Sequence, residues 1–252
     1  MTFARSITSA LFACSLLAAA DSKTVDKTLP LPLTGSVSLE SHNGSIQVST
    51  WDRPQIEIHA RIEMNSGFQD MEASRRRYEG TRVDIDTSGN SVVIKSKFPE
   101  WNNFSGSNPE IHYTINAPRT ANWTIRDHNS RIEVRELHAA LSIFTHNSRI
   151  IVTGLAGAFK LDTHNSDAKV AFSSLTAPSQ VDMHNGDVEL LLPSSSRFDL
   201  QTSSHNARVH SDFPVTTRGT RNRGSDLEGK VNGGGPSLRL NSHNGSFRIR
   251  AS

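Results

Sequence analysis

One recurring dipeptide, His-Asn, limits the folds open to this chain more than any other feature of its 252 residues. It occurs seven times, beginning at His42, His128, His146, His164, His184, His205 and His243. The central intervals are 18, 18, 20 and 21 residues, and the residue after each asparagine is Gly, Ser or Ala. A period that persists along a chain is typical of repeat architectures, in which each unit packs against its neighbours.

Apolar residues flank these dipeptides at two-residue spacing, as Leu39, Ile46 and Val48 do around His42. This is the period of a strand with one buried face. Asn followed by Gly or Ser suits a tight turn, because Asn and Gly tolerate positive φ. Each unit is therefore predicted to be strand, turn, strand. The predicted structural turn residues are Asn43, Asn129, Asn147, Asn165, Asn185 and Asn244.

A unit of two strands cannot bury its own apolar face, but stacked units can. The sequence therefore predicts an all-β, single-domain β-solenoid with rungs of about 18–21 residues and a dozen rungs at most. A sandwich of hairpins is the alternative, and the constant period favours the solenoid. One rung breaks the register: aligning Leu200 with Leu161 and Ala207 with Ala168 puts Ser203-Ser204 where His-Asn is expected. His205 is therefore predicted to be displaced from the row.

Residues 67–79 interrupt the β pattern. Phe68, Met71, Arg75 and Tyr78 recur at three- and four-residue spacing, which predicts a short amphipathic helix capped by Ser66 or Gly67. Strands are predicted on both sides, over residues 55–64, 82–86 and 91–97. Residues 216–236, rich in Gly, Arg and Asn, are predicted to be a long connection that replaces the turn of one rung.

The N-terminus has the pattern of an export signal. Arg5 precedes an apolar stretch, and Ala18-Ala19-Ala20 offers a cleavage site, so residues 1–20 are assigned to a signal peptide. Residues 21–34 are then an N-terminal extension and residues 35–252 the β-strand-repeat domain. No later apolar run predicts a transmembrane span. The expected location is the periplasm, the outer envelope or the extracellular space.

The single cysteine, Cys14, lies inside the predicted signal, so the mature chain would have no disulfide and no cysteine-based metal site. In an alternative interpretation, Leu11-Phe12-Ala13-Cys14 is a lipoprotein box and Cys14 carries a lipid anchor. Phe12 and the apolar residues after the cysteine fit that pattern poorly, which favours removal of Cys14 with the signal.

Three segments resemble the bacterial β-strand-repeat proteins called putative adhesins, a domain family of uncharacterised function. The first is the repeated unit, as in residues 41–48 (SHNGSIQV). The second is residues 111–118 (IHYTINAP), and the third is the ending, residues 229–235 (GKVNGGG) followed by 238–249 (LRLNSHNGSFRI). The resemblance covers residues 35–250 and implies a β-solenoid and an envelope location. It supplies no catalytic residues, and the histidine at nearly every turn departs from the family pattern.

The histidine row is the one feature with candidate chemistry. Strand parity puts each imidazole on the same face as mostly polar residues, such as Glu40 and Asp162, so the row is predicted to be exposed. Neutral imidazoles could bind Zn, Cu or Ni, and stacked imidazoles would repel one another once protonated by acid. We favour turn chemistry with stacked asparagines, and expect no cofactor and no metal. The candidate metal ladder is His42, His128, His146, His164, His184 and His243.

An enzyme is disfavoured by the same periodicity. Asp162, His164 and Ser166 contain the residue types of a hydrolase triad, but Asp182 and His184 repeat the arrangement one rung later. Catalytic groups are singular and share one cleft. The net charge of +2 gives no basis for nucleic-acid binding.

The sequence thus predicts a non-enzymatic, exported adhesion or interaction module, with a glycan or an envelope protein as the partner. The alternatives are a passive structural envelope protein, a metal-binding histidine ladder and a polysaccharide-active β-helix.

Overall fold

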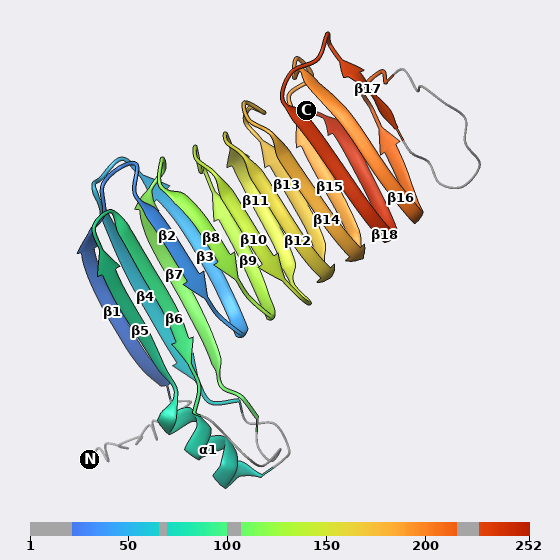
Figure 1. The fold of residues 1–252 in the computed structure, drawn as a ribbon. Helices are drawn as coiled ribbons and strands as arrows, with labels where there is room; N and C mark the ends of the chain where they lie inside the picture. Colours follow the sequence, from blue (N-terminus) through green and yellow to red (C-terminus); the bar gives the residue numbers. More distant parts are fainter. Residues whose placement is uncertain (1–21, 66–69, 100–106, 216–226) are drawn as a thin grey trace, which may run out of the picture.

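The computed structural model describes residues 22–65, 70–99, 107–215 and 227–252 (Figure 1). The prediction of an all-β chain with one short helix is confirmed, because eighteen strands and one helix account for the secondary structure of these ranges. The strands form one mixed sheet that is mostly parallel and curves until it is nearly closed. The predicted signal peptide and the candidate lipid anchor at Cys14 lie outside the described residues.

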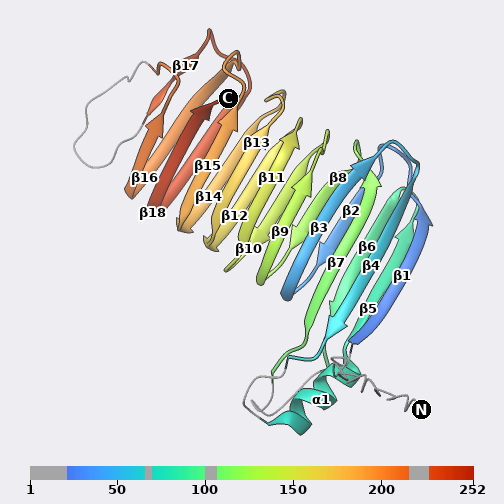
Figure 2. The same cartoon turned by 180° about the vertical axis from the view of Figure 1, so that it is seen from behind.

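The strands form two facing rows, each paired in parallel over most of its length (Figure 2). The first row contains, in spatial order, β6 (Ser91–Lys97), β2 (Ser36–Glu40), β8 (Asn122–Arg126), β10 (Leu141–Thr145), β12 (Phe159–Asn165) and β14 (Ser179–Asn185). The second contains β7 (Glu110–Pro118), β3 (Asn43–Trp51), β9 (Asn129–Arg135), β11 (Arg149–Leu155), β13 (Asp167–Phe172) and β15 (Asp187–Leu192). Two long strands, β18 (Ser237–Ala251) and β16 (Phe198–Ser211), bend through both rows.

Each His-Asn dipeptide lies where the chain passes from the first row to the second. We call this bend a corner, and the two strand segments that meet there a rung. The register puts equivalent positions side by side: Ile125 pairs with Ile143, Ile143 with Leu161, and Leu161 with Val181. The expected strand–turn–strand unit is therefore present.

The spatial order of the rungs differs from their order in the chain at both ends. The rung β2–β3 lies between β6–β7 and β8–β9, and β18 lies between β14–β15 and β16. The predicted displacement of His205 is wrong, because Leu200 pairs with Leu238 and Asn206 with Asn244, which aligns the two corners. Thr202 takes the buried place that an apolar residue takes in other rungs. Because threonine does not stand out as a core residue, aligning the rung on Leu200 shifted its register by two residues.

Antiparallel strands cover the ends of the stack. At the N-terminal end β4 (Gln55–Glu63) pairs with β7, β1 (Ser22–Pro30) pairs with β4, and β5 (Arg82–Ser88) pairs with β6. At the other end β17 (Glu228–Val231) pairs with β16. The 86-residue interval after His42 therefore holds one further parallel rung with its antiparallel cover, and the predicted N-terminal extension contributes β1. Unpaired strand edges are templates for association, so such covering strands limit the exposed edge.

Helix α1 (Met71–Gly80) lies at the N-terminal end of the stack. Its N-cap is Asp70, whose carboxylate accepts a hydrogen bond from Ala73 N at 3.0 Å. The sequence analysis put the start at residue 67, with Ser66 or Gly67 as the cap; those two residues lie outside the described ranges. A side-chain acceptor at the N-cap is what fixes a helix start, and Asp70 supplies it.

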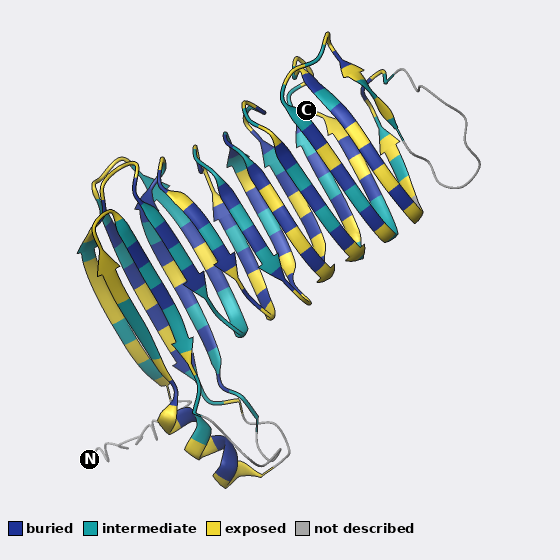
Figure 3. Ribbon diagram, in the orientation of Figure 1, coloured by how far each residue is buried: buried dark blue, intermediate teal, exposed yellow. Residues whose placement is uncertain are grey.

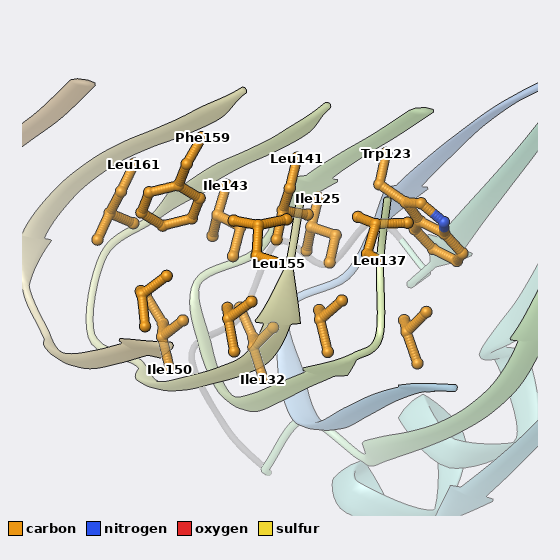
Figure 4. Packing of buried hydrophobic residues seen from close by; sticks show 14 of the residues in the cluster. Trp123, Ile125, Ile132, Leu137, Leu141, Ile143, Ile150, Leu155, Phe159 and Leu161 are labelled. Atoms are coloured by element: carbon orange, nitrogen blue, oxygen red, sulfur yellow. The ribbon is translucent and has the colours of Figure 1, made fainter. Parts of the chain in front are cut away.

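The core is one continuous hydrophobic cluster between the two rows (Figures 3 and 4). Buried and exposed residues alternate along each strand, as Figure 3 shows for the whole stack. In Figure 4, Trp123, Leu141 and Phe159 of the first row point toward Ile132 and Ile150 of the second. The apolar positions that flank the His-Asn dipeptides form this core, so its period in the sequence correctly predicted the buried face.

The histidine–asparagine edge as a candidate functional site

The seven corners align into one straight edge, which we call the His-Asn edge. In spatial order its histidines are His42, His128, His146, His164, His184, His243 and His205. Neighbouring rings are stacked, with centroids 4.5–5.5 Å apart and planes within 29° of each other. His42 is half-buried and the others are exposed, as the strand parity predicted. The ring of Phe98 contacts His42 edge-on and ends the stack.

The asparagines form a second column beside the imidazoles. Each side-chain amide donates from Nδ2 to Oδ1 of its neighbour, over 2.7–3.2 Å. The chain of hydrogen bonds runs through Asn43, Asn129, Asn147, Asn165, Asn185, Asn244 and Asn206. Such amide ladders form wherever identical strands stack in register. The edge therefore carries two parallel columns of identical groups.

Glycine allows the tight bend at three of the corners. Gly44, Gly186 and Gly245 have φ values of +124°, +124° and +127°, which residues with a side chain rarely adopt. A Cβ at Gly186 would lie 2.1 Å from the carbonyl oxygen of Ser166. The neighbouring rung therefore approaches too closely for any side chain at this position.

Serine occupies the same corner position in three central rungs and turns its hydroxyl inward. The Oγ of Ser166 accepts hydrogen bonds from Thr163 Oγ1 at 2.6 Å and from Ser148 N at 2.9 Å. Ser148 Oγ lies 2.5 Å from Thr145 Oγ1. In these three rungs, the residue immediately before the histidine and the residue two after it thus form a buried polar column behind the exposed edge.

Asp127 is the charged member of this buried column. Its carboxylate accepts hydrogen bonds from Ser130 Oγ at 2.6 Å, Ser130 N at 2.8 Å and Ser148 Oγ at 3.0 Å. Burial nevertheless raises the pKa of Asp127 above its ordinary value, and the serine hydrogen bonds only partly offset the loss of water. The sequence analysis missed this group, although its inward position follows from the same strand parity that placed His128 outside.

Burial also lowers the pKa of His42, and a charge on His128 would lower it further. The carboxylate of Asp127 acts in the opposite direction but is a smaller influence. His42 is thus held toward its neutral form at the end of the row, where Phe98 covers it.

A shallow groove follows the C-terminal half of the edge, with a volume of about 550 Å³. The imidazoles form one wall, Asp162, Asp182 and Asn241 form the other, and Thr163 and Ser242 belong to the floor. Both O atoms of Asp182 accept hydrogen bonds, from Gln180 Nε2 at 2.6 Å and Asn241 Nδ2 at 2.8 Å.

The geometry does not assemble the candidate hydrolase triad. Ser166 Oγ points into the buried column, whereas His164 is exposed on the outer side of the same corner. At the next rung Gly186 takes the place of the serine. Within the described ranges, no three His, Cys, Asp or Glu side chains come together in a way that could hold a metal ion. The six histidines of the candidate ladder stack face to face instead of converging on one point.

In the part of the chain that the structure describes, no helix has the length and apolar character needed to cross a bilayer.

Comparisons with known proteins agree with the fold. Residues 119–250 match the model of the family described as Toastrack DUF4097. A putative cell adhesion protein from Clostridium sporogenes superposes with a TM-score of 0.52 at 9% identity, over 91% of this chain and 100% of that one. Putative adhesins from Bacteroides fragilis and Parabacteroides merdae have TM-scores of 0.29 at 12% and 9% identity, over 91% and 90% of this chain and 97% and 96% of theirs. A comparison with curated proteins gave no match.

Proposed function

The chain belongs to the Toastrack DUF4097 family, and from that premise we propose that it is a non-enzymatic, exported interaction module whose binding surface is the His-Asn edge. The export-signal pattern predicted for residues 1–20 supports a location in the envelope or outside the cell. A relative in fold, from Clostridium sporogenes, is described as a putative cell adhesion protein. That description supports the adhesion class for this chain as well.

We also infer that the parallel part of the sheet is a β-solenoid. Equivalent positions of successive rungs pair in parallel in both rows, as Ile150 does with Ala168 and Ala168 with Val188. One hydrophobic cluster runs continuously between the rows. A stack of this kind presents its outer surfaces as long, regular arrays, which suit extended partners.

The uniform exposed edge is the observation that carries the proposal. The seven rungs that contain His-Asn place an imidazole and an amide on the same line, although the residue two after the histidine varies between Ser, Gly and Ala. The rungs repeat at the strand spacing of about 4.8 Å, so the edge offers the same donors and acceptors at regular steps. A linear partner can contact many rungs at once, whereas a small molecule can contact only a few.

The same regularity argues against catalysis. An active site needs a nucleophile, a base and a stabilising group around one reacting atom. Here each rung repeats its neighbour, and the inward serines are sequestered from the outward histidines.

Retention on immobilised polymers tests the proposal. The purified chain is passed over a neutral β-glucan, a uronic acid polymer and a peptidoglycan preparation. The edge variant combines His128→Ser, His146→Ser, His164→Ser and His184→Ser. The control variant combines His59→Ser, His138→Ser and His210→Ser, which lie outside the edge.

We expect wild type and control to be retained on at least one polymer and the edge variant to pass through. Circular dichroism establishes that all three chains are folded. Equal retention of wild type and edge variant would contradict the role of the edge. If no polymer retains the chain and it also fails to self-associate, the passive structural function becomes the better account.

A further inference from the structure

Charged residues of opposite sign flank the two halves of the four central rungs of the His-Asn edge, from His128 to His184. The end rungs carry single charges, Glu40 beside His42 and Arg208 beside His205. The relevant positions are two residues before and three residues after each histidine, which strand parity places on the outer surface on either side of the edge. At the His128 and His146 rungs these positions contain three arginines, Arg126, Arg131 and Arg149. At the His164 and His184 rungs they contain four aspartates, Asp162, Asp167, Asp182 and Asp187. The central edge is therefore positive toward the N-terminal end and negative toward the C-terminal end.

These charges remain available to a partner. Arg131 also contacts Glu133 at 2.7 Å, and Asp187 contacts Arg248 at 3.8 Å, yet their side chains are 56% and 52% exposed. Arg126 is exposed and lies over the ring of Phe144, 4.4 Å from its centroid. Six of the seven side chains are exposed; Asp182 is half-buried and also accepts hydrogen bonds from Gln180 and Asn241.

From this pattern we infer that the partner of the edge is a second copy of this chain, bound edge to edge in the antiparallel direction. The inference rests on the proposed function, since it names the partner of the same surface. The two-fold axis would cross the edge between His146 and His164. Closed dimers with such an axis are the commonest soluble assemblies, and their interface is self-complementary.

Symmetry selects the antiparallel arrangement. A two-fold axis that crosses the edge keeps each flanking column facing its own counterpart but reverses the order of the rungs. Arg126 then faces Asp182 of the partner subunit, and Arg149 faces the partner subunit's Asp167. A parallel arrangement exchanges the two columns at each rung. Arg126 would then face the partner's Arg131, and the aspartates of the His164 and His184 rungs would face aspartates, whereas Arg149 would face the partner's Phe144. Like charges across an interface are strongly unfavourable, so the charges also fix the register.

The rung spacing is compatible with this pairing. The two copies present identical edges with the same spacing between rungs. Six of the seven rungs, from His42 to His243, can therefore each face a rung of the other copy without an offset that grows along the edge. The contact is narrow, and exposed ion pairs are individually weak and screened by salt. We therefore expect a weak dimer that dissociates as the salt concentration rises.

Analytical ultracentrifugation of the full chain over a concentration series tests the inference at neutral pH and low salt. One variant combines Arg126→Glu with Arg149→Glu, and a second combines Asp167→Arg with Asp182→Arg. We expect each variant alone to dimerise at least ~10-fold more weakly than wild type, because four favourable contacts become repulsive. An equimolar mixture of the two should restore association to within ~3-fold of wild type, because every contact is again complementary.

A control variant with Lys27→Glu and Lys230→Glu changes the net charge as the first variant does, but away from the edge. It should dimerise as wild type. If either edge variant unfolds, two single variants, Arg131→Glu and Asp187→Arg, replace the two double variants, and the mixing experiment is repeated with them.

A wild-type chain that stays monomeric at every concentration would overturn the inference, and so would a mixture that fails to associate. Retention on a polymer in the previous experiment, without self-association here, would overturn the second copy as partner and leave the proposed function standing. Loss of both would remove the proposed function as well.

Discussion

The outer and inner sides of the His-Asn corners differ in how much the residue type varies from rung to rung. On the outer side, the histidine and the asparagine are the same at all seven His-Asn corners, whereas the rung β6–β7 has no such dipeptide. On the inner side, the position two residues after the histidine is Ser in three rungs, Gly in three and Ala in one. The inner serines are buried, and a Cβ at any of the three inner glycines would lie within 2.2 Å of a carbonyl oxygen of the neighbouring rung, so hydrogen bonding and space decide what fits. The outer imidazoles, His42 apart, face water, so packing does not require their uniformity, whereas the outer asparagines are hydrogen-bonded to one another along the column. The comparison separates the inner residues and the asparagines, which hold the fold, from the imidazoles, which are free to bind.

The largest effect is expected on the inner side, at Gly186. The substitution Gly186→Ala adds a Cβ at a φ of +124° and 2.1 Å from a carbonyl oxygen. We expect the free energy of unfolding to fall by about 3 kcal/mol, measured by urea denaturation. Gly89→Ala is the matched control, because Gly89 also has positive φ but no atom within 4 Å of the added Cβ. It should cost about 1 kcal/mol. Equal losses would show that crowding between rungs is unimportant.

The amide column should show an intermediate effect. Asn165 donates to Asn147 and accepts from Asn185, so Asn165→Ala removes two hydrogen bonds in the middle of the column. We expect a loss of about 1.5 kcal/mol in the free energy of unfolding. Asn206→Ala removes one bond at the end of the column and should cost about half as much. If both substitutions cost the same, the column does not act through its hydrogen bonds.

Asp127 tests whether a charged carboxylate buried on the inner side of a corner lowers the stability of the fold. Its folded pKa is raised, so the ionised form is less favourable in the folded chain than in the unfolded chain. That cost is fully present at pH 7 and disappears as the pH falls through the raised pKa toward the unfolded value. Relative to wild type, Asp127→Asn should therefore be more favourable at pH 7 than near pH 3.5, by on the order of 1 kcal/mol, because the amide never carries the buried charge. Unfolding curves at both pH values measure this, and the same difference between variant and wild type at the two pH values would contradict it.

The smallest effect is expected at the outer end of the row. The pKa of His42 is lowered in the folded chain, so the unfolded chain binds its proton more readily. The corresponding stability is present above the unfolded value of about 6.5 and is lost as the pH falls through the folded pKa. In His42→Gln, the loss of unfolding free energy between pH 7 and pH 5 should be smaller than in wild type by only a fraction of a kcal/mol, because solvent screens a half-exposed group. Thermal melts from pH 7 to pH 5 measure it, and unchanged acid sensitivity in the variant would contradict it.

The local part of the fold was readable from the sequence. Alternating apolar residues beside each His-Asn identified strands and their buried face, as with Ile125 and Ile132, because side chains of a strand point alternately to its two sides. The same rule placed the imidazoles outside. The helix near Met71 was found from its three- and four-residue spacing. These features depend on residues close together in the chain, and local geometry is enough to fix them.

The tertiary structure decided what depends on partners far away in the chain. The rung of His205 is the last in the stack although β18 follows it in sequence, because β17 returns antiparallel to β16 and lets β18 pair on its other side. Asp127 links two rungs only in the folded stack, where Ser148 of the next rung donates a hydrogen bond to it beside those from Ser130. The positive half of the edge ends at Arg149 and the negative half begins at Asp167. These residues lie side by side only because β11 pairs with β13. The alternation of residues in the sequence determined which side chains of each rung are buried and which are exposed. Hydrogen bonding between strands far apart in the chain determined which rungs are neighbours.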